Sequence, residues 1–260
     1  GWIDNMEYRP LGKTGMEVSA LSFGASSLGG VFHPVDEKQA IETAHIALRS
    51  GINYVDVSPF YGLTKAETVL GKALKEIDRD SYYISTKVGR YGQTQADFDF
   101  SAERIYSSIE ESLSRLGLEY MDMVFCHDIE FGDLDQVVEE TIPALRELKK
   151  QGKLRFIGVS GYPLKIFKYV LDRTDLDVIL SYCRYSLNDT TLLELVPYLK
   201  EKSVGIVNAS PLSMGLLTTR GAPDWHPAAS EIKKACRETA VYFEEKGINL
   251  SRLALQFSLN

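Results

Sequence analysis

Cysteine is scarce in this chain, which has three among its 260 residues, at positions 126, 183 and 236. A small, odd and widely spaced set argues against a disulfide framework and favours a reduced compartment, so we expect a cytoplasmic protein. Long apolar runs are also missing, and the first residues show no basic stretch followed by an apolar one. We therefore expect neither a membrane span nor a secretory signal.

Positive charge is in the minority, with 29 Lys and Arg against 36 Asp and Glu and a net charge of −7. The two signs are interspersed along the chain, without a basic patch or an acidic tail. This balance argues against nucleic acid or an anionic membrane as the main partner, and we expect a monomer that acts on small molecules. The hydrophobic fraction of 44% is ordinary for a globular protein.

A glycine-rich GxGxxG loop is absent after the first apolar run. Seven apolar runs of strand length alternate with amphipathic segments, which is typical of repeated βαβ units around a parallel sheet. The predicted strands are 18–25, 52–57, 82–88, 121–127, 154–160, 176–182 and 204–210, and the clearest predicted helices are 37–51, 102–117, 135–152 and 191–202. Seven units without the dinucleotide-binding loop favour an α/β fold of the (β/α)8 TIM barrel type over a doubly wound sheet.

The two ends of the chain carry further expectations. Residues 6–19 contain Gly12 and Gly15 and predict an N-terminal hairpin that covers the bottom of the barrel. Residues 250–260 resemble a helix of the seventh unit, so we expect a single domain over 1–260 that lacks the eighth βα unit. Such a barrel would leave unpaired edges on its first and seventh strands.

Polar residues close three successive apolar runs. Asp56 ends the second run, Lys87 the third and His127 the fourth, and Tyr61 follows Asp56 in the next loop. Each alone has an ordinary explanation, as a turn former, a solvated lysine or a packing histidine. Together, at the carboxyl ends of neighbouring barrel strands, they predict one catalytic mouth.

The chemistry of these four side chains favours proton transfer at an oxygen. An ammonium beside a phenol lowers the pKa of the phenol, so Lys87 would make Tyr61 a usable acid or base, with Asp56 holding Lys87 in place. His127 would orient the substrate oxygen. None of the four carries hydride, so a redox reaction at this site needs a cofactor.

The motifs DVSPFYG, STKVGR, VFCHD, GVSG and ASPLSMGLLT together resemble the aldo-keto reductases, over nearly the whole chain and in the same order. Longer strings, among them CHDIEFGDLDQVVEETIPAL and ILSYCRYSLNDTTLL, are similar to the L-galactose dehydrogenase branch. That branch oxidises a sugar at C1 to a lactone, usually with NAD. The resemblance implies Tyr61 as general acid/base, Asp56 and Lys87 as its tuners, and His127 as the residue that orients substrate.

The resemblance also implies a groove for NAD or NADP across the barrel mouth. Its implied cofactor residues are Gly24, Asp56, Ser160, Gly161, Tyr182, Ser210, Leu212, Met214 and Gly215. Three positions depart from the family pattern: Gly161 replaces a common Asn, Tyr182 or Ser181 a common Gln, and Ala209 an aromatic residue. Tyr182 and Tyr185 are then the candidates to stack on the nicotinamide.

Other assignments compete with this one. Cys126 beside His127 suggests a thiol nucleophile, but successive strand residues point to opposite faces, so we expect Cys126 to pack against a helix. Asp56, His127 and Asp128 suggest a metal hydrolase, which the absence of an HxH pair disfavours, so we expect no metal. A cofactor-binding regulatory subunit without turnover is the alternative to an enzyme. The predicted substrate-pocket residues are Phe32, Arg90, Tyr91, His127 and Trp225.

Overall fold

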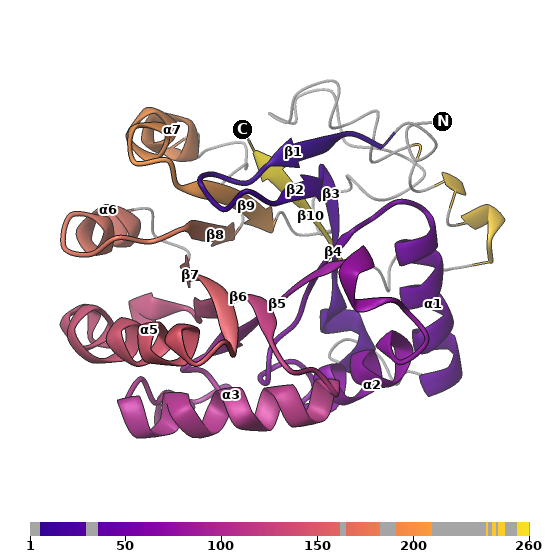
Figure 1. Cartoon of the computed structure of the whole chain (residues 1–260), viewed down its shortest axis with the longest axis horizontal. Coiled ribbons are helices and arrows are strands. Elements are labelled where there is room, and N and C mark those ends of the chain that lie inside the picture. Colours follow the sequence, from indigo (N-terminus) through magenta and orange to yellow (C-terminus); the bar gives the residue numbers. More distant parts are fainter. Residues whose placement is uncertain are drawn as a thin grey trace.

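Eight strands form a closed barrel in the computed structural model, which describes residues 6–29, 36–161, 165–182, 191–209, 238, 241–242, 244–247 and 254–259 (Figure 1). Seven of them run parallel and are neighbours in chain order. They are β3 (Leu21–Gly24), β4 (Tyr54–Asp56), β5 (Tyr83–Val88), β6 (Met121–Cys126), β7 (Leu154–Gly161), β8 (Val178–Tyr182) and β9 (Gly205–Ala209). All seven predicted strands are confirmed.

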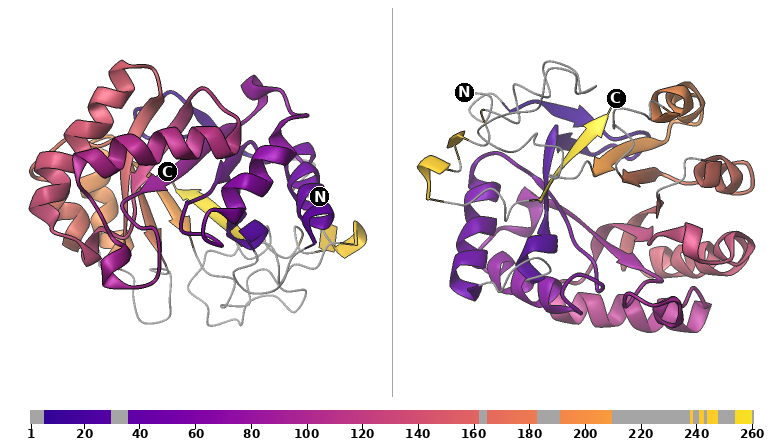
Figure 2. Two further views of the ribbon diagram at one scale, coloured as in Figure 1. Left: turned by 90° about the horizontal axis from the view of Figure 1, so that it is seen from below. Right: turned by 180° about the vertical axis from the view of Figure 1, so that it is seen from behind.

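Helices form a layer outside these strands (Figures 1 and 2). They are α1 (Glu37–Arg49), α2 (Lys65–Leu74), α3 (Ala102–Leu116), α4 (Leu134–Gln136), α5 (Ile142–Lys150), α6 (Lys165–Leu171) and α7 (Thr191–Glu201). Local sequence explains their ends: the Ser101 side chain accepts from the backbone N–H of Arg104 at the start of α3, and Gly117 ends it with a φ of 66°. Pro143 stands in the first turn of α5, directly after a π-helical turn over Val137–Thr141.

The C-terminal segment differs from its prediction. Strand β10 (Ala254–Leu259) stands where the sequence suggested a helix, and it pairs antiparallel with both β3 and β9. The expectation of an open barrel with two unpaired edges is therefore wrong, although the eighth place is held by an antiparallel strand and not by a further βα unit. Without β10, the edges of β3 and β9 would carry unpaired backbone N–H and C=O groups. The sequence ALQFSL suits a strand at this place, because apolar and polar residues alternate in most of it.

The predicted hairpin is confirmed as β1 (Tyr8–Pro10) and β2 (Glu17–Ser19). Its side chains Leu11, Met16 and Val18 are buried in one cluster with side chains from inside the barrel. The hairpin therefore closes the end of the barrel opposite the carboxyl ends of the strands. Close approach of the turn to β9 needs glycine, because a Cβ at Gly12 would lie 2.4 Å from the backbone nitrogen of Gly205.

Successive side chains of β6, β8 and β9 lie in two different apolar cores. Phe125 belongs to the inner cluster with the hairpin, whereas Cys126 belongs to the outer cluster between strands and helices. Each large apolar side chain buried in this way contributes roughly 1.5–3 kcal/mol. The alternation fixes which residues face the barrel interior. Among the described residues, no helix is both long and apolar enough to cross a membrane.

Candidate active site

A buried ion pair joins the ends of β4 and β5. Lys87 Nζ lies 2.6 Å from Asp56 Oδ2 and 3.0 Å from the carbonyl oxygen of Val57, and both side chains are fully buried. The second carboxylate oxygen of Asp56 accepts from Ser85 Oγ at 2.5 Å. Because both oxygens have donors, the pair compensates much of the free-energy cost of burying two charges.

Tyr61 lies beside this pair, as predicted. Its ring centroid is 4.9 Å from Lys87 Nζ. Burial by itself lowers the pKa of Lys87, but the charges and hydrogen bonds of Asp56 and Tyr61 outweigh it and raise that pKa above its ordinary value. Lys87 is therefore an ammonium group at neutral pH, held between a carboxylate and a phenol.

His127 completes the cluster that the sequence predicted. Its ring stands edge-on to the Tyr61 ring, with centroids 6.0 Å apart. Burial, followed by the charges of Lys87 and Arg90, holds the pKa of His127 well below its usual value, so the imidazole is neutral. Nδ1 lies 3.2 Å from Ser58 Oγ, and Nε2 lies 3.3 Å from Asp128 Oδ2. A carboxylate can only accept, so we assign the proton to Nε2 and let Nδ1 accept from Ser58.

Arg90, predicted as a pocket residue, lies at the rim beside His127. Its Nη1 donates to Asp128 Oδ2 at 2.5 Å, and its guanidinium stacks 4.0 Å from the ring centroid of Phe60. Burial raises the pKa of Asp128, and Arg90 opposes that rise. The arrangement places a fixed cation and an aromatic wall at the edge of the site.

Tyr91, the other predicted pocket residue in this loop, is not directed to the mouth. Its hydroxyl accepts from the backbone N–H of Gly89, and its ring lies under the guanidinium of Arg104 on α3. Gly89 has a φ of 98°, and Arg90 pairs with Phe98, so the chain turns back at this point. Phe32 and Trp225 lie outside the described residues.

Gly24 and Ser160 line the same mouth at the ends of β3 and β7. Gly24 is the strand partner of Asp56, and the fully buried Ser160 hydroxyl accepts from the backbone N–H of Asp128 at 3.0 Å. Because this bond uses only the Ser160 oxygen, the hydroxyl proton can serve as a donor to the carboxamide of a nicotinamide. This end of the implied cofactor groove therefore suits the group.

Gly161 faces away from the mouth. A Cβ at this position would meet Glu130 Oε2 at 2.6 Å and Ile166 Cδ1 at 2.3 Å, on the helix side of β7. The backbone of Tyr182 ends β8, but its side chain is outside the described part. The same is true of all atoms of the remaining predicted cofactor residues, Ser210, Leu212, Met214 and Gly215, and of Tyr185.

Three residues of the site were not predicted: Ser58, Ser85 and Tyr54. Tyr54 Oη lies 2.5 Å from Ser85 Oγ, and this contact extends the hydrogen bonds of Asp56 into the barrel interior. The signal for two of them was the period of two residues along a strand, because Tyr54 precedes Asp56 and Ser85 precedes Lys87 by that interval.

The competing assignments find no support in the described part of the chain. Cys126 is fully buried in the outer core, and burial raises the pKa of its thiol to about 12, so it is no nucleophile. The described residues contain no group of three or more His, Cys, Asp or Glu side chains placed to hold a metal ion.

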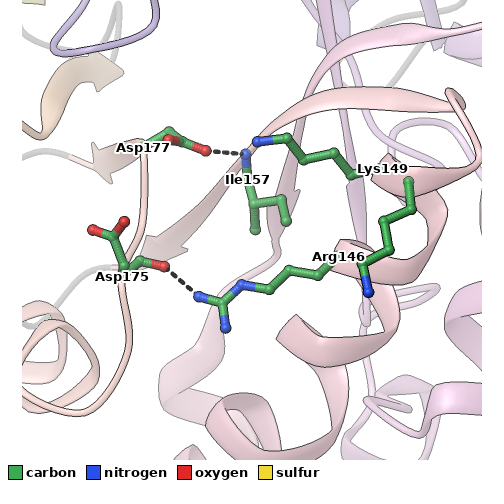
Figure 3. A pocket seen from close by; sticks show the side chains of 6 residues that line it. Arg146, Lys149, Ile157, Asp175 and Asp177 are labelled. Atoms are coloured by element: carbon green, nitrogen blue, oxygen red, sulfur yellow. Dashed lines mark hydrogen bonds between the residues drawn. The ribbon is translucent and has the colours of Figure 1, made fainter.

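A cavity of about 470 Å³ lies away from this site (Figure 3). Arg146 and Lys149 of α5 line it, together with Ile157 of β7 and with Asp175 and Asp177 just before β8. Lys13 of the hairpin binds Asp175, which places this cavity toward the closed end of the barrel.

Comparison with known proteins agrees with this geometry. The family model "Aldo/keto reductase family" matches residues 20–260. L-galactose dehydrogenase of Arabidopsis thaliana is 56% identical, over 99% of this chain and 81% of its own length. D-arabinose 1-dehydrogenase of Saccharomyces cerevisiae is 33% identical, over 94% of this chain and 76% of its own. The solved holo form of an aldo-keto reductase from Bacillus halodurans is 34% identical with a TM-score of 0.72, covering 84% of this chain and 71% of its own. The chain therefore belongs to the aldo/keto reductase family and is an NAD(P)-dependent oxidoreductase.

Proposed function

We propose that the chain oxidises an aldose at C1 to a lactone, with L-galactose as the first substrate to test and NAD as the first cofactor. The observation that carries the proposal is the contact of Lys87 with both Asp56 and Tyr61, beside a neutral His127. This set matches the chemistry of removing a proton from a hydroxyl group while hydride leaves the adjacent carbon.

Each residue then has a defined task. The Tyr61 oxygen takes the proton of the C1 hydroxyl, and the Lys87 ammonium stabilises the phenolate that accepts it. Asp56 fixes the position and charge of Lys87 through the 2.6 Å ion pair. His127, whose neutral ring stands edge-on to the Tyr61 ring, orients the same substrate oxygen. The nicotinamide dinucleotide, when bound, supplies the acceptor for hydride, and Ser160 is placed to hold its carboxamide.

The choice of an aldose rests on the relatives. Three of them carry names of aldose-oxidising enzymes, and L-galactose dehydrogenase is the most similar of these three. Reduction of a small aldehyde or ketone uses the same residues in reverse, and a relative named NADH-specific methylglyoxal reductase, 30% identical, makes that the second candidate. A regulatory subunit without turnover is disfavoured, because no member of the Asp56, Tyr61, Lys87 and His127 set is missing.

A panel assay tests the proposal. The protein is mixed with NAD or NADP and each of several aldoses, or with NADH or NADPH and small carbonyl compounds, and nicotinamide absorbance is followed. The proposal predicts the highest kcat/KM for L-galactose with NAD. A higher value for carbonyl reduction would replace it with the second candidate, and no turnover with any pair would favour the regulatory role.

Two further proposals concern the setting of the enzyme. We infer a cytoplasmic monomer from the three scattered cysteines and the mixed surface charge. Size-exclusion chromatography with light scattering checks the monomer, and fractionation of cells that express the protein checks the compartment.

A further inference from the structure

Two hydroxyl groups extend the hydrogen bonds of the catalytic ion pair into the barrel interior. Tyr54 Oη lies 2.5 Å from Ser85 Oγ, and Ser85 Oγ lies 2.5 Å from Asp56 Oδ1. All three side chains are fully buried. We propose that Ser85 and Tyr54 are positioning residues, which hold Asp56 in place and through it tune Tyr61 as the base; this rests on the proposed role of Tyr61.

Strand register brings these groups together. Asp56 on β4 stands opposite Ser85 on β5. Tyr54 comes two residues before Asp56 and Lys87 two residues after Ser85, so all four side chains point to the same face of the sheet. Tyr54 belongs to the inner cluster with the hairpin, which places this face inside the barrel.

The hydrogen bonds have one direction. An ionised Asp56 can only accept, so the Ser85 hydroxyl donates to it and its own oxygen is left to accept from Tyr54. Burial, followed by the charge of Asp56, raises the pKa of Tyr54 well above its usual value, so Tyr54 keeps the proton that it donates. Tyr54 lies among Phe125, Val178 and other apolar side chains of the inner cluster, which shield this donor from water.

The consequence reaches the reacting phenol. Two O–H dipoles in sequence turn their positive ends toward Asp56 and stabilise its negative charge. Without the Ser85 hydroxyl, Asp56 Oδ1 loses this one hydrogen bond, and the less stabilised carboxylate cancels more of the positive potential that Lys87 exerts on Tyr61. The phenolate form of Tyr61 is then less stable, so its pKa rises.

The experiment measures that rise in the free enzyme. Tyrosine labelled with carbon-13 at Cζ gives one resonance per side chain, and the resonance lost in Tyr61→Phe identifies Tyr61. We expect Ser85→Ala to raise the titration midpoint of Tyr61 by about 0.5–1 pH unit, Tyr54→Phe to raise it less, and Ser85→Thr to restore it. The matched control is Ser22→Ala, because Ser22 is also fully buried and its hydroxyl has no hydrogen-bond partner among the described residues.

Turnover gives a second readout. Below the midpoint, kcat for aldose oxidation follows the phenolate fraction, so Ser85→Ala should lower it about three- to tenfold and Ser22→Ala should not. The proposal is overturned if Ser85→Ala has a lower melting temperature but the same titration midpoint of Tyr61 as the native protein. If Ser85→Ala does not fold, the proposal is overturned by an unchanged Tyr61 midpoint in Tyr54→Phe. Full turnover in Tyr61→Phe would instead refute the proposed function, and the resonance titration would still decide on Ser85.

Discussion

Replacement of Asp56 by Asn tests the buried ion pair, because it removes one charge and almost no volume. The pair joins two fully buried side chains at 2.6 Å, and removing one partner of such a pair costs about 3–5 kcal/mol. The control is Glu37→Gln, since Glu37 and Lys72 are also 2.6 Å apart but their side chains are 49% and 46% exposed. An exposed pair contributes about 1 kcal/mol or less.

The pH dependence of Asp56→Asn gives the sharper result. In the native protein, burial lowers the pKa of Lys87, but Asp56 and Tyr61 raise it above its ordinary value of 10.5. The stability that Lys87 contributes is then fully present below that value and is lost as pH rises through the folded pKa. In Asp56→Asn the burial of Lys87 prevails and lowers its pKa in the folded protein. The unfolded chain then binds more protons than the folded one, so stability rises with pH toward 10.5.

Urea unfolding at pH 7 and pH 9 measures the stability that Asp56→Asn loses and how that loss changes with pH. We expect Asp56→Asn to lose about 3 kcal/mol or more at pH 7 and to recover part of it at pH 9, while Glu37→Gln loses about 1 kcal/mol or less at both. The reasoning is refuted if the two variants lose the same amount, or if Asp56→Asn recovers nothing at the higher pH.

Three further predictions concern other parts of the molecule. Burial, with Lys87 and Arg90, lowers the pKa of His127, so the stability of the native protein should fall as pH drops below about 6.5. Between pH 7 and pH 5, the free energy of unfolding should fall by about 2 kcal/mol more in the native protein than in His127→Gln, as urea unfolding at the two pH values can measure. The Cys126 thiol, whose pKa is raised to about 12, should resist iodoacetamide at pH 8 in the folded protein and react in urea, as peptide mass spectrometry can show. Gly12→Ala should cost about 3 kcal/mol or more in urea unfolding, because its Cβ meets the backbone of Gly205 at a φ of 51°. Gly15→Ala, at a φ of 75° with open space around its Cβ, should cost only about 1–2 kcal/mol.

The strands, most helices and the core of the site could be predicted because they depend on local pattern. Apolar runs end at Asp56, Lys87 and His127, and a parallel barrel brings such ends to one mouth. The same argument could not place Tyr91, because the turn at Gly89 redirects the chain after β5. Alternation along strands identifies the barrel interior, but only the register of β4 against β5 shows that Ser85 reaches Asp56.

The C-terminal segment shows where pattern is ambiguous. LSRLALQFSL satisfies a helical period and, over its second half, a strand period. Pairing with β3 and β9 decides between the two, and those partners lie more than 40 residues away in sequence. The contact of Arg90 with Phe60 and Asp128 also joins three different loops, and no spacing in the sequence indicates it.

The central claim is that Tyr61 exchanges the proton at the reacting oxygen beside Lys87. Its most direct measurement is the turnover of Tyr61→Phe with L-galactose and NAD, together with the affinity for NADH by nucleotide fluorescence. We expect kcat to fall by at least about 10²-fold while NADH affinity stays within about twofold of the native value. A variant that binds NADH normally and retains the native kcat would contradict the account.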